Sequence, residues 1–96
     1  MSKYILSNKA VSDIEGIAIY TIHKWGVNQA RKYKQGLESI CTTLSKNPSI
    51  GKNYQNETLN IKQFPFKSHM IFYKIREQDV LIIRILIQSM YYKIHL

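Results

Sequence analysis

Few side chains in this 96-residue sequence have the type and spacing that enzyme chemistry needs. His23, His69 and His95 are far apart, with no cysteine or carboxylate at the short spacings of metal ligands, so we predict no metal site. The single cysteine, Cys41, lies on the apolar stripe of a predicted helix, and we expect a small core residue rather than a nucleophile. The six carboxylates are scattered and suggest no acid–base pair. We therefore expect no catalytic residues and no cofactor, although a nuclease acting through Lys, Arg and Tyr alone stays open.

Residues suited to contacts with another molecule gather at the C-terminal end, directly after an apolar segment. They are Gln88, Ser89, Met90, Tyr91, Tyr92 and Lys93. Aromatic side chains near a chain end, where burial is hardest to complete, often anchor interfaces. The alternative is that this tail folds back onto the core.

Arg84 interrupts the apolar segment 80–87. A guanidinium in a core strand is costly unless something pairs with it. Arg84 either contacts a partner or target, or forms an internal pair with Asp or Glu, or reaches water at a chain end. The sequence supports the intermolecular and the structural interpretation of Arg84 about equally.

Two apolar segments, 69–75 and 80–87, flank the polar turn 76–79 and predict a β-hairpin. The second strand is apolar on both alternating faces, so we expect it inside a sheet. Ahead of them, 3–6 is a short extended segment. The sequence 48–58 reads as a loop, 59–62 as a short strand, and 64–68 as the turn into the hairpin.

Helical spacing of apolar residues predicts a first helix that is capped by Ser7 or Asn8 and stops at Gly26. A second helix is expected from Asn28 to the Asn47-Pro48 pair. Tyr20 and Tyr33 should pack on these helices with their hydroxyls at the rim.

The first helix is apolar on more than one side. Such a helix is either buried on both sides or offers a face to a partner. The candidates for a partner-binding surface are Ile19, Ile22, Trp25 and Tyr33, joined by Arg84 if its charge is used between molecules.

The element order is β-α-α-β-β-β, which predicts an α+β fold: an antiparallel sheet covered by an N-terminal helical hairpin. Its length suits a single domain spanning 1–96. No apolar run has the ~20 residues of a membrane-spanning helix and no signal-peptide pattern is present, so we expect no membrane partner. One cysteine fits a reducing cytoplasm.

The chain is basic, with 14 Lys and Arg against 6 Asp and Glu and a formal net charge of +8. This balance favours an acidic partner, either a nucleic acid or an acidic protein segment. The lysines are spread along the chain without a basic run or a nucleic-acid signature. An acidic protein and a nucleic acid are therefore equally supported by charge alone.

Nearly end to end, the sequence resembles the ParE toxins of bacterial toxin–antitoxin modules, within the wider RelE/ParE superfamily. The matching fragments keep the family's order and spacing. They are Tyr4-Ile5-Leu6-Ser7, Asp13-Ile14, Tyr20-Thr21, Trp25-Gly26, Gln29-Ala30, Asn47-Pro48, Ser68-His69-Met70-Ile71-Phe72-Tyr73, Arg84-Ile85-Leu86 and Gln88-Ser89-Met90.

The resemblance implies a small toxin that inhibits DNA gyrase by binding and is neutralised by an acidic, ParD-like antitoxin, without sequence-specific nucleic-acid binding of its own. It implies a role in plasmid or chromosomal stability. RelE-type relatives instead cut mRNA on the ribosome. They place a basic residue where this chain has Gln88-Ser89-Met90, so the gyrase branch is favoured.

Two positions depart from the ParE pattern: Ile87 stands where His is common, and Tyr91 where Asp is common. Both fall in the region that the resemblance links to toxicity. These departures suggest a weakened toxin or one with a shifted target. The alternatives to gyrase inhibition are a ribosome-dependent endoribonuclease and an inactive relative that only binds its antitoxin. On the gyrase interpretation, the target-binding residues are Arg84 and the tail residues named above.

Overall fold

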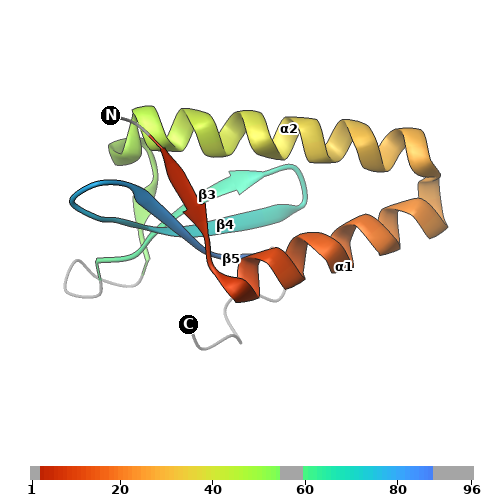
Figure 1. Cartoon of the computed structure of the whole chain (residues 1–96), viewed down its shortest axis with the longest axis horizontal. Coiled ribbons are helices and arrows are strands. Elements are labelled where there is room, and N and C mark those ends of the chain that lie inside the picture. The colour runs from red at the N-terminus through yellow and green to blue at the C-terminus, as the bar shows by residue number, and fades with distance from the viewer. Residues whose placement is uncertain (1–2, 55–59, 88–96) are drawn as a thin grey trace.

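The computed structural model describes residues 3–54 and 60–87. Two long helices precede a five-stranded sheet in the chain (Figure 1). The elements are β1 (Tyr4–Leu6), α1 (Asn8–Trp25), α2 (Val27–Lys46), the 3-10 helix η1 (Pro48–Ile50), β2 (Lys52–Asn53), β3 (Lys62–Phe66), β4 (His69–Ile75) and β5 (Val80–Ile87). The predicted α+β class is confirmed.

The strand order is β1-β5-β4-β3-β2. The β4–β5 hairpin has the predicted bounds, and β5 lies inside the sheet as its two-sided apolar pattern indicated. The prediction of an antiparallel sheet holds for three strand pairs, but β1 pairs with β5 in parallel. This parallel pair joins distant parts of the chain, so no local turn signal could reveal its direction.

Between α2 and β4 the prediction was partly wrong. The expected loop 48–58 contains η1 and the two-residue strand β2. The strand expected at 59–62 begins at Lys62 and continues to Phe66, so it includes Phe64-Pro65-Phe66, for which the sequence predicts a turn. Pro65 is accommodated because β2 pairs only with Lys62 and Gln63, so the rest of β3 is an edge, where strands tolerate proline.

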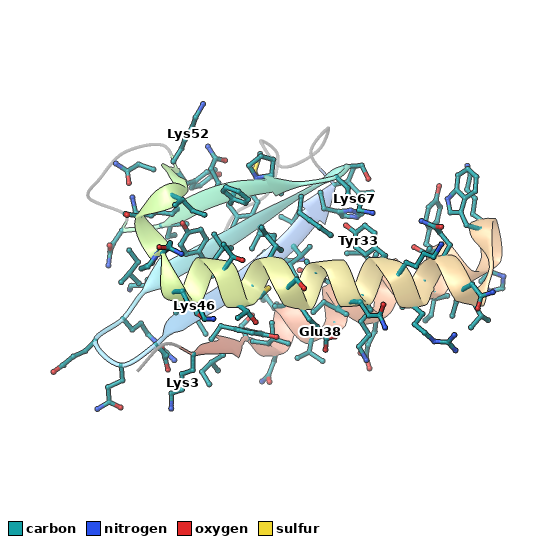
Figure 2. The ribbon with its side chains drawn as sticks, turned by 90° about the horizontal axis from the view of Figure 1, so that it is seen from above. Lys3, Tyr33, Glu38, Lys46, Lys52 and Lys67 are labelled. Atoms are coloured by element: carbon teal, nitrogen blue, oxygen red, sulfur yellow. The ribbon has the colours of Figure 1, made fainter. Side chains whose placement is uncertain are left out.

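The core lies between α2 and the sheet. Leu37, Cys41 and Leu44 recur at helical spacing on α2 and pack against a cluster that includes Ile71 and Tyr73 of β4. From α1, Ala10 is fully buried, and α1 packs mainly on α2 and β5. The far end of the helical hairpin extends past the sheet (Figures 1 and 2), so its side chains have no strand to pack on.

The hairpin's turn is built on Gly26, whose φ of 95° is in the region that glycine adopts most easily. Its N–H donates to the carbonyls of Thr21 and Ile22, which closes the end of α1. The second helix begins at Val27, one residue before the predicted start. The two helices are therefore joined by a single residue, which holds their projecting ends together.

Candidate functional site

The projecting end of the helical hairpin carries exposed apolar side chains on more than one side of α1, and we call this set the tip patch. It consists of Ile19 (60% exposed), Tyr20 (60%), Ile22 (42%), Trp25 (65%) and Val27 (55%). Lys24 lies among them, with its ammonium 5.8 Å from the ring centre of Tyr20 and 5.9 Å from that of Trp25. Clustered large apolar side chains at a protein surface mark interaction sites more often than isolated ones do.

A cavity of about 300 Å³ opens between the two helices next to the tip patch. Ile22 and Val27 line it from the patch side, and Tyr33 lines it from α2. Arg31 and Lys34 also line it, so the cavity has apolar walls and two cations. Such a hollow suits an amphipathic partner with carboxylates beside its apolar face.

The structure brings together three of the predicted partner-binding residues, Ile19, Ile22 and Trp25, within the tip patch. Tyr33 shares the inter-helix cavity with Ile22. Tyr20 and Val27 were missed by the sequence analysis, and Tyr20 is exposed rather than packed. The apolar character of α1 on more than one side indicated a partner-binding face. Only the fold, in which the end of α1 projects past the sheet, shows which of its residues are exposed.

Tyr33 also joins α2 to the sheet (Figure 2). Its hydroxyl and Nδ1 of His69 are 2.5 Å apart, and its ring makes an edge contact with Phe66 at 5.2 Å between centres. The ammonium of Lys67 lies 5.8 Å from the Tyr33 ring centre. Burial raises the pKa of Tyr33 to about 12 and lowers the pKa of His69, with the charge of Asp13 opposing the latter shift. Tyr33 is thus a packed residue with one side facing the cavity.

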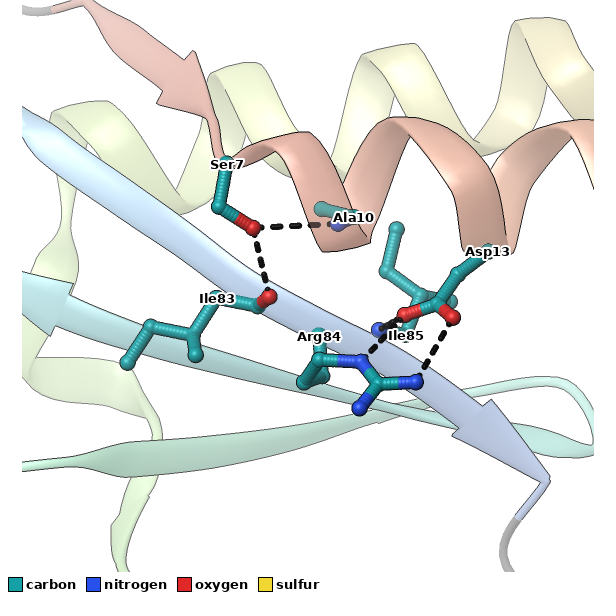
Figure 3. A network of polar contacts seen from close by, with 6 residues as sticks. All are labelled: Ser7, Ala10, Asp13, Ile83, Arg84 and Ile85. Atoms are coloured by element: carbon teal, nitrogen blue, oxygen red, sulfur yellow. Dashed lines mark hydrogen bonds and ion pairs between the residues drawn. The ribbon is translucent and has the colours of Figure 1, made fainter. Parts of the chain in front are cut away.

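Arg84 is paired inside the protein (Figure 3). Its Nε and Nη2 donate to the two carboxylate oxygens of Asp13 on α1, at 2.8 and 2.9 Å. This geometry is the bidentate pair that guanidinium and carboxylate form best. Asp13 raises the pKa of Arg84 further above its ordinary value through these hydrogen bonds. The internal pair that the sequence left open is therefore present, and a role of Arg84 in binding stays a prediction.

A β-bulge beside Arg84 sets its position. Phe72 is opposite Arg84 and Tyr73 is opposite Ile82, so Ile83 is an extra residue in β5. In a regular strand, Ile82 and Ile85 would lie on opposite faces of the sheet. Because the bulge inserts one residue between them, both are buried. Without this shift, the side chain of Arg84 would alternate onto the helix-facing side of the sheet with Ile82.

Ser7 and Asp13 hold the start of α1 against β5 (Figure 3). The Oγ of Ser7 accepts from the N–H of Ala10, as an N-cap does, and donates to the carbonyl of Ile83 at 2.7 Å. Asp13 also accepts from the N–H of Ile85 at 3.0 Å. These bonds hold residues 83–85 of β5 against α1, ahead of the predicted target-binding tail. That tail, Gln88, Ser89, Met90, Tyr91, Tyr92 and Lys93, lies outside the described residues.

The described part of the chain offers little for covalent chemistry. Cys41 is buried in the core, and burial raises the pKa of its thiol to about 12, with the charge of Glu38 adding to the shift. Within residues 3–54 and 60–87, no three His, Cys, Asp or Glu side chains are grouped to hold a metal ion. No helix in the same ranges is long and apolar enough to cross a membrane.

Comparison with known proteins identifies the family. Residues 4–92 match the family described as the ParE toxin of the type II toxin-antitoxin system parDE. The chain is 33% identical over 96 residues to Toxin ParE1 of Caulobacter vibrioides, covering 100% of this chain and 99% of that protein. It is 30% identical over 90 residues to Toxin ParE1 of Mycobacterium tuberculosis, covering 93% of this chain and 92% of the relative.

A solved structure supports the fold. The chromosomal ParDE TA system from P. aeruginosa contains a chain that superposes with a TM-score of 0.77 at 17% identity, covering 91% of this chain and 96% of that one. At this identity the likeness concerns the fold alone, and it agrees with the two helices and five-stranded sheet. Because the family match and the curated relatives both span nearly the whole chain, this protein belongs to the ParE toxin family of type II toxin–antitoxin systems.

Proposed function

We propose that this toxin is neutralised by an acidic antitoxin segment that is disordered alone and folds over the helical hairpin. The single observation that carries this proposal is the tip patch, which leaves Ile19, Trp25 and their neighbours in water on a protein of net charge +8. Covering one large apolar side chain is worth about 1.5–3 kcal/mol, so several together can offset the ordering cost of a flexible segment.

The charges around the patch favour an acidic partner. Lys24 lies within the patch, and Arg31 and Lys34 line the adjoining cavity. An antitoxin with apolar residues facing Trp25 and carboxylates facing these cations would meet complementary groups. The basic side chains would also speed its association at low salt.

The experiment that tests the antitoxin proposal is co-expression with the product of the neighbouring gene. The expected result is a complex that survives purification and restores growth in cells arrested by the toxin alone. The proposal fails if an acidic neighbouring product is present in the same extract and the toxin elutes without it.

We further propose that the toxin inhibits DNA gyrase by binding, as its resemblance to ParE toxins implies. In this proposal, contacts with gyrase are made by the tail from Gln88 through Lys93. Arg84 contributes by holding the end of β5 to α1 through Asp13, so that the tail starts from a fixed point. Aromatic anchors such as Tyr91 and Tyr92 are typical of residues that dominate interfaces.

Truncation separates a binding tail from a tail that completes the core. A chain ending at Ser89 should lose growth arrest and gyrase inhibition, yet keep a cooperative thermal transition and bind the antitoxin. A truncated chain that stays fully toxic would move the gyrase-binding surface elsewhere. If Ile87→His with Tyr91→Asp creates inhibition that the natural chain lacks, the protein is an inactive relative.

A further inference from the structure

The projecting end of the helical hairpin carries positive charge without carboxylates. Between Glu15 and Glu38 the chain has no Asp or Glu. The Lys and Arg residues in the same interval are Lys24, Arg31, Lys32 and Lys34. Because Gly26 alone joins the helices, the end of α1 and the start of α2 that carry these cations lie side by side (Figure 1). Within the described residues, none of the four forms an ion pair with a carboxylate. This end of the protein therefore favours an anionic ligand.

Two exposed aromatic rings accompany these cations. Tyr20 and Trp25 are both largely in water, and neither packs against the core cluster. The ammonium of Lys24 lies 5.8 Å from the ring centre of Tyr20 and 5.9 Å from that of Trp25. The hairpin end thus presents a cation beside two ring surfaces that the described protein does not use for packing.

A single strand of nucleic acid has the groups that match this arrangement. Its phosphates attract Lys and Arg, and its unstacked bases lie flat on aromatic side chains. A duplex offers the phosphates, but its bases are stacked on one another and cannot reach Tyr20 or Trp25. An acidic peptide pairs with the cations but need not supply a planar ring. The combination of exposed rings and unpaired cations therefore favours a single strand.

We propose that this end of the helical hairpin binds a single strand of DNA without reading its sequence. Bases stack on Tyr20 and Trp25, while Lys24 and the cations near the start of α2 contact phosphates. The choice of DNA over RNA rests on the proposed inhibition of gyrase, whose substrate is DNA. The contact extends that function, because the toxin would then hold the DNA as well as the enzyme.

The fluorescence of Trp25 tests the stacking contact, since Trp25 is the only tryptophan of the chain. Purified toxin is titrated with oligothymidine of about 12 nucleotides, a length that single-strand-binding domains cover. A base stacked on Trp25 should quench its fluorescence. An abasic strand of equal length has the phosphates alone and should bind at least about tenfold more weakly. Absence of binding, binding without quenching, or equal affinity for the abasic strand each overturns the proposal. Polyglutamate bound as tightly as oligothymidine also overturns it, because the surface would then be a site for acidic peptides.

Substitutions at the hairpin end locate the contact, with anisotropy of a labelled oligothymidine as the measurement. Trp25→Ala should weaken binding at least about tenfold. Lys24→Gln should weaken it and lower the slope of log affinity against log salt by about 0.7, the value for one phosphate contact on a single strand. Lys46→Gln is the matched control, because it removes the same charge from an exposed position at the opposite end of α2 (Figure 2). It should change the affinity by about twofold or less. Equal losses for the two lysine variants would indicate general attraction to a basic protein and would overturn the site.

An assay of gyrase inhibition separates this inference from the proposed function. A toxin that inhibits gyrase but does not bind oligothymidine keeps the proposed target and loses the DNA contact. A toxin that binds oligothymidine through Trp25 but leaves gyrase active keeps the single-strand site and loses the proposed target. Oligouridine bound at least about tenfold more tightly than oligothymidine would overturn the choice of DNA over RNA.

Discussion

Arg84 and Asp13 are 71 residues apart in the sequence and are joined by two hydrogen bonds of 2.8 and 2.9 Å. The same carboxylate accepts from the backbone N–H of Ile85 at 3.0 Å. The first helix is therefore fixed to the interior strand of the sheet by one acidic side chain with three donors around it. In the proposed function, this connection sets where the C-terminal tail begins.

Removing Asp13 should cost more stability than removing Arg84. Arg84→Ala loses a partly buried ion pair, for which we expect about 2 kcal/mol of unfolding free energy. Asp13→Ala loses the same pair and also leaves the N–H of Ile85 without its acceptor, so about 3 kcal/mol is expected. Urea denaturation of the two variants measures the difference. A smaller loss for Asp13→Ala than for Arg84→Ala would contradict the assignment of the Ile85 bond.

The control for this comparison is Arg76→Ala. Arg76 makes a bidentate pair with Asp79 in the β4–β5 turn, but its side chain is 42% exposed. Exposed pairs of this kind add little to stability. The control should therefore unfold at nearly the same urea concentration as the natural chain.

The hydroxyl of Tyr73 holds the segment after α2 against the sheet. It donates to the carbonyl of Pro48 at 2.6 Å and accepts from the N–H of Gly51 at 3.0 Å. Tyr73→Phe should lower the free energy of unfolding by about 1–3 kcal/mol, because the buried Gly51 N–H loses its acceptor. Chemical denaturation measures this, and a loss below the experimental error would show that the segment is held by other contacts.

Gly51 is needed because of the same hydroxyl. A Cβ on Gly51 would overlap the Tyr73 hydroxyl and approach the Gln63 carbonyl to 2.9 Å. Gly51→Ala should therefore be strongly destabilising alone and less so in a Tyr73→Phe background, where the overlapping oxygen is gone. The measurement is a double-mutant cycle, in which fully additive losses would exclude the steric cause.

Stability should fall as the pH is lowered through the titration of His69. Burial lowers the pKa of His69 below its ordinary value of 6.5. When the pH falls below that value, the unfolded chain takes up a proton that the folded chain does not, so folding is weakened until the pH passes the folded-state pKa. His69→Gln can keep a hydrogen bond to Tyr33 without titrating. Its thermal midpoint should therefore fall less than that of the natural chain from about pH 8 to about pH 5. Equal falls would contradict this account.

The tip patch should contribute to partner binding without contributing to stability. Trp25→Ala and Ile19→Ala remove side chains that are 65% and 60% exposed, so the thermal midpoint should hardly change. Antitoxin affinity should fall by roughly thirty-fold if Trp25 is an interface anchor worth about 2 kcal/mol. Calorimetric titration measures this loss. Lys9→Ala serves as a control on the exposed start of the same helix.

The parts of the fold that could be predicted are those with a periodic signal. The β4–β5 hairpin and the two helices have long apolar patterns and clear ends at Gly26 and Asn47. The two-residue strand β2 is too short to show alternation, and Pro65 made the edge strand β3 look like a turn. The parallel pairing of β1 with β5 depends on contacts between distant segments, for which the sequence has no local marker.

The candidate site was predictable to a similar degree. Apolar residues on more than one side of α1 indicated Ile19, Ile22 and Trp25 as partner-binding candidates. The structure leaves all three exposed, because this end of the helix projects past the sheet. Asp13 was not recognised as the partner of Arg84, since a contact over 71 residues leaves no spacing pattern.

A supercoiling assay tests most directly the proposed inhibition of DNA gyrase by this ParE-family toxin. Purified toxin is titrated into gyrase and relaxed plasmid DNA, with and without the antitoxin from the neighbouring gene. If the proposed function holds, we expect loss of supercoiling, accumulation of gyrase-cleaved plasmid, and recovery of supercoiling when the antitoxin is added first. Full supercoiling at a large excess of folded toxin, together with cleavage of mRNA on ribosomes by the same preparation, would contradict it.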